Sequence, residues 1–461
     1  MAHIVLSVWT THPRLNTSFE LARRLKSRGH RITYVTYTGL KSRISENGFE
    51  FVGINWGRSV VTDSNYQFHG NMRLWQKLAR FPDLLKLRHE IIQRFVTNME
   101  FEDALKELKP DILIIDLEMQ PYVIASSHLG IPTILFFDMF SVWKTPGIPP
   151  LDSTLVPNKS WFRWLVIKWL WFCWDVQRFR DAIRRKILTF GTDWVSVLKV
   201  LAQYKQFPFR KEADCSHWLT PLVFRSIPVV TTNVLEMEFS PNPPKNVHYV
   251  GPLISHKDNQ HRANENFEEI FCSLISQREE KGLVRPLIYC SISTFVQADK
   301  DFLRNVLQVF EIKKDWDMIL SLSKKVRIQD LGPIPSNVFA FDWIPQPKVL
   351  EYADGAISHG GTTSINECIY FGVPMVVYST KTMDHNGNAA RVAYHRLGIV
   401  ADKDKDKVED IIHNIEFVLT DLNIKTSVLK MREVYLNYEK SNRAVSFVEN
   451  FHKEVSGNKQ C

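Results

Sequence analysis

The residues best suited to chemistry stand in one stretch, SHGGTTSINE, from Ser358 to Glu367. The stretch joins a short apolar run, ADGAIS, to a helix-like run, INECIYF, which ends at Gly372 and Pro374. A strand, a glycine-rich turn and a helix start bring unpaired backbone N–H groups and the positive end of the helix dipole to one point. The pattern therefore predicts a site for an anion such as phosphate. A capping box, with Ser364 as cap and Glu367 three residues later, is the alternative.

Composition narrows the class of protein. With 461 residues, 44% of them hydrophobic, the chain can bury a large core but is too long for one ordinary domain. The six cysteines lie far apart and form no CxxC pair, which argues against a zinc site or a disulfide framework and favours a reducing cytoplasm. The first residues, MAHIVLSVW, enter a strand pattern directly, without the features of a secretory signal.

The net charge of +8 is concentrated in one segment. Between Lys159 and Lys211, twelve Lys or Arg stand against three Asp, which leaves the rest of the chain close to neutral. The same segment holds five of the thirteen tryptophans, in WFRWLVIKWLWFCW, residues 161–174. As a helix of about 1.5 Å per residue this run is too short to cross a bilayer core of about 30 Å. It is predicted either to attach to an anionic membrane surface, through residues 159–211, or to form the wall of an apolar pocket. Nucleic-acid binding is not expected, because no recognition motif accompanies the charge.

Strand and helix patterns alternate in both halves of the chain. Apolar runs such as HIVLSVW, DILIID and PTILFF separate amphipathic helices in the first half, and PLIYCSIS, GAIS and PMVVYS do so in the second. The alternation predicts an α/β protein with two Rossmann-like halves, whose ligands bind in the cleft at the carboxyl ends of the strands. The predicted parts are a first domain at 1–239 with a Trp-rich helical insertion at about 155–215, a linker at 240–251, a second domain at 252–422 and helices at 423–461.

About fifty residues from Phe341 onward carry polar positions in a fixed order. The elements are W-x-x-Q from Trp343, HGG-x-x-S-x-x-E from His359, GVP from Gly372 and D-x-x-x-NAAR from Asp384. This order resembles the donor-binding signature of the family 1 glycosyltransferases, the UDP-glycosyltransferase superfamily. The twelve-residue gap before His359 is similar to that of bacterial macrolide and carotenoid (zeaxanthin-type) members. HPRLNTSFELARRLKSRGHRITYVT and PDILIID extend the resemblance to the first half, and residues 140–235 are unmatched.

The resemblance implies a GT-B fold, with two facing Rossmann-like domains, a cleft between them and C-terminal helices that cross back to the N-terminal domain. It also implies a set of donor-binding residues: Ser291, Thr294, Trp343, Gln346, His359, Gly361, Thr363, Ser364, Glu367, Asp384 and His385. Trp343 is expected to stack on a uracil ring, with a place in the core as the alternative. Gln346 would pair with base or ribose and Glu367 with the ribose hydroxyls. Asp384 and His385 would bind the sugar.

The remaining donor residues would hold the diphosphate, through the hydroxyls of Ser291, Thr294, Thr363 and Ser364, the imidazole of His359 and the backbone at Gly361. Charge that builds on the leaving diphosphate can then be stabilised without a metal. The expected reaction is inverting hexose transfer from a UDP-sugar, or a TDP-sugar, as co-substrate, without cofactor or metal. The Trp- and Phe-rich middle predicts a lipophilic small-molecule acceptor with a hydroxyl group.

The catalytic base departs from the family pattern. The family's histidine stands sixteen residues before the His of RGH, and that position here is Arg14. His12 is the expected base, with Asp116 at the end of DILIID as its partner. Asp116 acting alone is an alternative, and so is a non-catalytic protein that binds nucleotide sugars or helps another enzyme. A membrane-associated glycolipid synthase at the inner face of the membrane is a further alternative.

Overall fold

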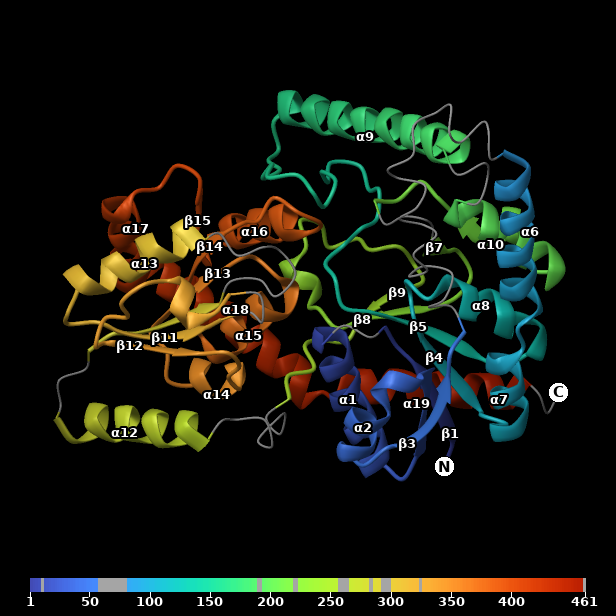
Figure 1. The fold of residues 1–461 in the computed structure, drawn as a ribbon, viewed down its shortest axis with the longest axis horizontal. Helices are drawn as coiled ribbons and strands as arrows, with labels where there is room; N and C mark the ends of the chain where they lie inside the picture. The colour runs from blue at the N-terminus through green and yellow to red at the C-terminus, as the bar shows by residue number, and fades with distance from the viewer. Residues whose placement is uncertain are drawn as a thin grey trace.

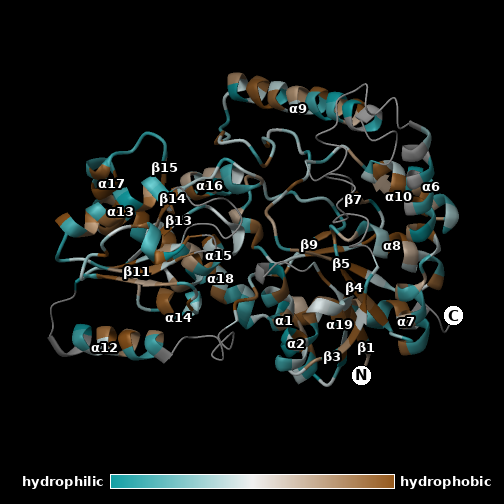
Figure 2. Ribbon diagram, viewed as in Figure 1, coloured by the Kyte–Doolittle hydropathy of each residue, from teal (hydrophilic) through white to brown (hydrophobic). Residues whose placement is uncertain are grey.

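The computed structural model describes residues 1–9, 12–56, 81–188, 193–218, 223–255, 265–281, 285–291, 300–322 and 326–458. They form two parallel β-sheets, each flanked by helices, which lie side by side in Figure 1. Apolar residues are concentrated in the strands (Figure 2), and the buried core lies there. The predicted α/β class with two Rossmann-like halves is confirmed.

The first sheet has seven parallel strands in the order β3-β2-β1-β4-β5-β8-β9. Its strands are β1 (His3–Ser7), β2 (Arg31–Tyr37), β3 (Glu50–Ile54), β4 (Ile112–Asp116), β5 (Thr133–Phe137), β8 (Val229–Thr231) and β9 (Val247–Tyr249). Its helices are α1 (His12–Ser27), α2 (Lys41–Glu46), α6 (Phe81–Thr97), α7 (Glu100–Leu108) and α8 (Gln120–Ser126). Because β9 pairs with β8, the sheet extends into the predicted linker at 240–251.

The second sheet has six parallel strands in the order β12-β11-β10-β13-β14-β15. Its strands are β10 (Leu287–Ser291), β11 (Asp317–Ser321), β12 (Val338–Phe341), β13 (Gly355–Ser358), β14 (Met375–Tyr378) and β15 (Gly398–Ala401). Its helices are α12 (Glu265–Lys281), α13 (Lys300–Ile312), α14 (Gln346–Leu350), α15 (Thr362–Phe371), α16 (His385–Tyr394) and α17 (Val408–Thr420). Short 3₁₀ turns occur at Thr38–Leu40, Ser127–Leu129, Leu235–Met237 and Ile328–Asp330.

Each sheet has one point where the strand order reverses. In the first sheet this point lies between β1 and β4, and in the second between β10 and β13. Loops that leave the carboxyl ends of two such strands diverge to opposite faces of the sheet, so a ligand fits between them. The reversal points therefore locate the two halves of the candidate site.

The last two helices, α18 (Leu422–Lys440) and α19 (Arg443–Asn458), lead back to the first sheet (Figure 1). Ala444, Val445 and Val448 of α19 belong to the same buried cluster as Ile4 of β1 and Phe19 of α1. The predicted crossing of the C-terminal helices to the N-terminal domain is confirmed.

The predicted helical insertion contains α9 (Trp161–Leu188), α10 (Trp194–Tyr204) and α11 (Phe209–Glu212). A two-stranded antiparallel pair, β6 (Ala213–Asp214) and β7 (Val223–Phe224), follows them. Helix α9 runs along one edge of the molecule, apart from both sheets (Figure 1). Within the described ranges, no helix combines the length and the apolar content needed to cross a membrane.

Candidate functional site

The loop between β13 and α15 is shaped by two glycines. Gly360 has a φ of +90°, and a Cβ atom there would lie 3.1 Å from the carbonyl oxygen of His385 and 3.2 Å from Val377. A Cβ on Gly361 would lie 2.8 Å from Nε2 of His359. Only glycine therefore lets the chain turn this sharply and lets the His359 ring lie over the start of α15.

Helix α15 starts without a side-chain cap. Its N-cap is Gly361, which makes no side-chain hydrogen bond, and Thr362 is the first helical residue. Ser364 stands third in the helix, so the capping-box alternative with Ser364 as cap is wrong. No side chain at the cap position competes for the first N–H groups of the helix, and an anion can bind there.

The predicted side chains on α15 share one side of the helix. Thr363, Ser364 and Glu367 are partly exposed, whereas Ile365 and Asn366 are buried. Residues three and four apart are neighbours on a helix surface, so Glu367 lies beside both Ser364 and Thr363, which are in the first turn after the glycine loop.

Two histidines lie beside this helix start. The rings of His359 and His385 meet edge to face, with centroids 5.0 Å apart. Nδ1 of His359 lies 3.3 Å from the carbonyl oxygen of Ser291, the last residue of β10, so the ring bridges the reversal point of the sheet. Burial, and then the neighbouring His385, lower the pKa of His359 to about 4. His359 is therefore neutral at neutral pH, with Nε2 directed at Gly361.

Asp384 is held against the same helix start. Its Oδ2 accepts hydrogen bonds from the Thr362 hydroxyl at 2.9 Å and from the Asn388 amide at 2.8 Å. The preceding Met383 has a φ of 48°, a left-handed conformation that non-glycine residues adopt at a cost and that often marks functional loops. The predicted pair Asp384 and His385 thus lies beside the α15 start.

Trp343 and Gln346 follow β12. Trp343 is partly exposed, so it is not a fully buried core tryptophan. Oε1 of Gln346 accepts a hydrogen bond from Tyr289 of β10 at 2.9 Å. Its Nε2 is buried and finds no hydrogen-bond partner among the described residues. An unpaired buried donor is costly, so this amide is suited to a ligand acceptor. Thr294 lies outside the described residues.

The first domain contributes a cluster of charges at its own reversal point. Arg14 lies 3.2 Å from Asp116 at the end of β4, 2.6 Å from Glu118 and 3.0 Å from Asp138, which follows β5. Although burial works to lower the pKa of Arg14, the three carboxylates raise it well above its ordinary value. Arg14, the residue at the family's histidine position, is therefore a permanent cation bound to the expected partner of His12.

Two carboxylates of this cluster bind a proton more tightly than usual. Burial raises the pKa of Asp116, against the opposing effect of Arg14. Burial raises the pKa of Asp138 to about 6, against the opposing effect of Arg14, and Asp116, Glu118 and Asp384 raise it further. The influence of Asp384 shows that the two domains bring their charges together here. Neither Asp138 nor Glu118 was predicted from the sequence, although Asp138 directly follows the apolar run PTILFF, as a strand-end residue of a parallel sheet does.

Asp116 itself is saturated with donors. Besides Arg14, the backbone N–H groups of Glu118 at 2.9 Å and Trp9 at 3.4 Å donate to it. His12 is the first residue of α1, and its side chain lies outside the described part of the chain. The dyad of His12 and Asp116 stays a prediction.

Buried polar contacts join the two domains behind the site. Arg391 of the NAAR element donates to Glu238 at 3.0 Å through Nε, and both side chains are almost fully buried. Glu238 also accepts from the backbone of Ser141 at 2.7 Å. On α15, Asn366 donates to Asn233 at 2.8 Å. These contacts fix the second domain against the first, a role the sequence did not indicate for Arg391.

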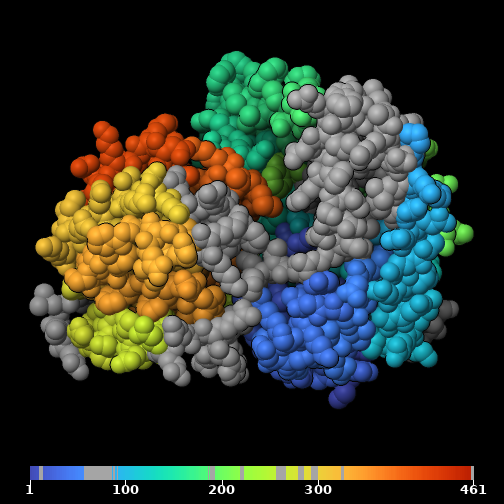
Figure 3. All heavy atoms as spheres, viewed as in Figure 1, coloured from blue at the N-terminus to red at the C-terminus, as the bar shows by residue number. Residues whose placement is uncertain are grey.

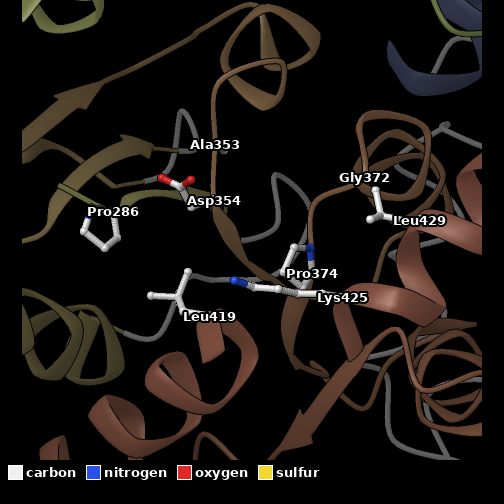
Figure 4. A pocket seen from close by; sticks show the side chains of 8 residues that line it. All are labelled: Pro286, Ala353, Asp354, Gly372, Pro374, Leu419, Lys425 and Leu429. Carbon is white, nitrogen blue, oxygen red and sulfur yellow. The ribbon is translucent and has the colours of Figure 1, made fainter. Parts of the chain in front are cut away.

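A surface pocket lies away from these residues (Figure 4). The residues that line it include Pro286, Asp354 and Pro374, which directly precede β10, β13 and β14, respectively. The pocket is therefore at the amino ends of the strands, opposite the glycine loop.

In the described ranges, no group of three His, Cys, Asp or Glu side chains is arranged to hold a metal ion.

Comparison with known proteins agrees with this architecture. Residues 306–447 match the family described as erythromycin biosynthesis protein CIII-like, C-terminal domain. NDP-glycosyltransferase YjiC of Bacillus subtilis (strain 168) is 30% identical over 200 residues, 41% of this chain, and the match spans only 50% of that relative's length. Zeaxanthin glucosyltransferase of Pantoea ananas is 23% identical over 414 residues, 86% of this chain and 84% of that protein.

The glycosyltransferase of kitacinnamycin has a similar structure, with a TM-score of 0.66 and 18% identity over 98% of both chains. Two facing parallel sheets with C-terminal helices that return to the first domain define the GT-B fold. These similarities support the resemblance to the family 1 glycosyltransferases.

Proposed function

We propose that this chain is an inverting, metal-independent glycosyltransferase that moves a hexose from a UDP-sugar to a hydroxyl group of a lipophilic small molecule in the cytoplasm. The observation that carries the proposal is the start of α15, which lies at the reversal point of the second sheet, lacks a side-chain cap and is covered by His359. This arrangement suits a diphosphate. A TDP-sugar is the alternative donor.

The diphosphate would lie against the backbone at Gly361 and the hydroxyls of Thr363 and Ser364. His359 is neutral before the donor binds, and a bound anion raises its pKa, so the imidazole gains a proton where negative charge is present. As the nucleoside diphosphate leaves, its growing charge would meet both this imidazolium and the helix dipole. A metal is then not required.

The other donor groups would extend from this centre. The free Nε2 of Gln346 would donate to the base or ribose, beneath an indole face supplied by Trp343. Glu367 would accept the ribose hydroxyls from its place one turn into α15. Asp384 and His385 would bind the hexose at the side that faces the first domain.

The acceptor hydroxyl needs a base on the far side of the sugar, and in-line attack from that side inverts the anomeric carbon. His12 remains the proposed base, with Asp116 as its partner. The charge cluster supplies a second candidate, because Asp138 is influenced by the charge of Asp384 and has a pKa of about 6, suited to proton transfer near neutral pH.

A lipophilic acceptor is supported by the aromatic content of the insertion. Trp171 of α9 packs inward and donates through Nε1 to the carbonyl of Ile148 at 2.7 Å, so apolar residues border the segment that leads from β5. The likeness to a zeaxanthin glucosyltransferase, whose name states a carotenoid acceptor, points the same way.

The test is incubation of the purified protein with a panel of nucleotide sugars and lipophilic alcohols, with products detected by mass spectrometry. The expected product is a monoglycosylated alcohol whose anomeric configuration, read by NMR, is opposite to that of the donor. Addition of EDTA is expected to leave the rate unchanged. Retention of configuration would exclude inversion, and activity that EDTA removes and magnesium restores would exclude metal independence.

The salt bridge between Arg14 and Asp116 favours a second candidate, a helper protein that binds a nucleotide sugar without transferring it. Such a protein would bind UDP, measured by calorimetry, yet transfer no sugar to any acceptor in the panel. A His12→Ala variant and an Asp138→Asn variant separate the two bases in an active protein, because only loss of the working base removes turnover. A glycolipid synthase at the inner face of the membrane remains the third candidate, with an acceptor held in the bilayer.

A further inference from the structure

Among the described residues, helix α9 buries large apolar side chains on one face. Ile167 and Trp171 are buried, and Trp171 is fixed by its hydrogen bond to the carbonyl of Ile148. The 28 residues of the helix, at about 1.5 Å each, give a rod of roughly 42 Å. Figures 1 and 3 show this rod along the outer edge of the molecule.

The opposite face of α9 carries an apolar stripe. We define the outer stripe as Trp161, Leu165, Trp169, Phe172, Val176 and Phe179, which are between 44% and 74% exposed. Their spacing of three or four residues, at about 100° per residue, places all six within an arc of about 80°. The buried Ile167 lies about 160° from the centre of this arc and the buried Trp171 about 120° from it. The stripe therefore faces solvent along most of the helix, whereas large apolar side chains of a monomeric protein are normally exposed singly.

Basic side chains border the outer stripe on both sides. The helical angles place exposed Lys168 and Lys186 along one border and exposed Arg180 and Arg184 along the other. In total α9 has seven Lys or Arg and two Asp. One of these aspartates, Asp175, is paired with Lys144 at 2.6 Å. An apolar strip rich in tryptophan between two basic borders complements a bilayer surface with anionic headgroups.

A second copy of this chain is a poorer occupant. Two outer stripes packed together would bring the basic borders of both helices close to one another, and like charges repel. A bilayer surface instead offers apolar depth for the stripe and negative charge for both borders.

The chain segment just before α9 contacts the part of the site where Asp384 and His385 would bind the donor sugar. The carbonyl of Asp152 accepts a hydrogen bond from Asn386 at 2.9 Å, directly after Asp384 and His385. Leu151 packs so closely on Gly387 that a Cβ there would lie 2.0 Å from its carbonyl oxygen. A surface that binds α9 is therefore only a few residues of chain away from the proposed site of the donor sugar.

We propose that α9 lies flat in the surface of an anionic phospholipid bilayer, with the outer stripe inserted and the basic borders on the headgroups, and that this places the cleft where a membrane-dissolved acceptor enters. The docking rests on α9 alone, and only the delivery of acceptor rests on the proposed function. The helix lies in the interface and does not span the membrane.

The experiment is flotation of the full-length protein with vesicles of phosphatidylcholine alone and of phosphatidylcholine mixed with phosphatidylglycerol. The protein is expected to float with the anionic vesicles. A stripe variant, Trp161→Ser, Trp169→Ser and Phe172→Ser, is expected to lose binding by roughly tenfold or more, because its buried apolar area is removed. A control variant, Tyr204→Ser, Tyr352→Ser and Leu422→Ser, changes exposed apolar residues elsewhere and is expected to float like the wild type.

Charge is tested separately, in variants that keep the stripe. The border variant, Arg180→Glu and Arg184→Glu, is expected to lose at least about tenfold in binding to anionic vesicles, since each basic residue contributes about fivefold. Its matched control is Lys430→Glu and Lys440→Glu, two exposed lysines of α18. Equal flotation of border and control variants would overturn the proposal, and so would a wild type that ignores anionic vesicles.

Light scattering distinguishes self-association. A wild-type dimer that the stripe variant converts to a monomer would assign the outer stripe to a second copy and overturn the membrane assignment. Sugar transfer to a water-soluble alcohol keeps the two proposals apart. A protein that transfers sugar but does not float would contradict only this inference. A protein that floats but never transfers sugar would contradict only the proposed function.

Discussion

Asp138 and Arg14 show how a single substitution changes a site. An arginine at the family's histidine position cannot accept a proton, and three carboxylates gather round it. One positive charge cannot balance three negative ones, so the cluster favours retention of a proton. Burial raises the pKa of both Asp116 and Asp138, and that of Asp138 rises to about 6.

If Asp138 is the base, activity must follow its ionisation. A carboxyl group accepts a proton only when it is ionised, so kcat/KM is expected to rise with pH through about 6 and to level off above it. Asp138→Asn is expected to lower kcat by at least about a hundredfold and to remove this rise. The measurement is a pH profile of initial rates for wild type, Asp138→Asn and His12→Ala. A profile that keeps its rise in Asp138→Asn, and loses it in His12→Ala, would assign the base to His12.

At the scale of elements, the two glycines of the loop between β13 and α15 allow stability and ligand binding to be tested separately. Gly360→Ala must adopt a φ of +90° and also approach the His385 carbonyl and Val377. Gly332 has nearly the same φ, +89°, but open space around it. Gly360→Ala is therefore expected to destabilise by about 1 kcal/mol or more beyond Gly332→Ala, as measured by urea unfolding. Equal losses in the two variants would mean that the close contacts at Gly360 have no energetic weight.

Gly361→Ala probes binding rather than folding. Its φ of −67° suits alanine, but the new Cβ displaces the His359 ring from the start of α15. The expected result is a smaller loss of stability than in Gly360→Ala, because the φ is relaxed, and UDP affinity reduced by roughly tenfold, read by calorimetry, because a hydrogen bond to a charged group contributes about 1.5–3 kcal/mol. Unaltered affinity would contradict a diphosphate at this helix start.

The strands and the polar strand ends of the second domain were predictable, because they depend on residues that are close together in the sequence. Apolar runs gave the strands, and the order of motifs from Trp343 to Arg391 indicated which strand ends carry polar groups. The neighbours of Arg14 were not predictable, because Asp116 ends one strand, and Glu118 and Asp138 follow strands that only the folded sheet brings together. The same holds for α9, since its length and its outward stripe depend on which face the rest of the protein buries.

At the scale of the whole molecule, the cleft depends on contacts that hold the domains at a fixed distance. Arg391 and Glu238 are the central pair, because both are almost fully buried and each comes from a different domain. Glu238 is further fixed by Ser141 and by the Tyr249 hydroxyl at 3.1 Å. Removing one partner would leave the other charge buried and uncompensated.

Arg391→Ala is therefore expected to lower the free energy of unfolding by about 3–5 kcal/mol. The double variant Arg391→Met, Glu238→Gln removes both charges and is expected to recover a large part of that loss. Lys313→Ala breaks a partly exposed pair with Glu416 and serves as control, with an expected cost of about 1 kcal/mol or less. Urea unfolding measures all three, and UDP calorimetry shows whether the donor site survives. A loss in Arg391→Ala no larger than in the control would mean that the packing of α18 and α19, rather than this buried pair, sets the distance between the domains.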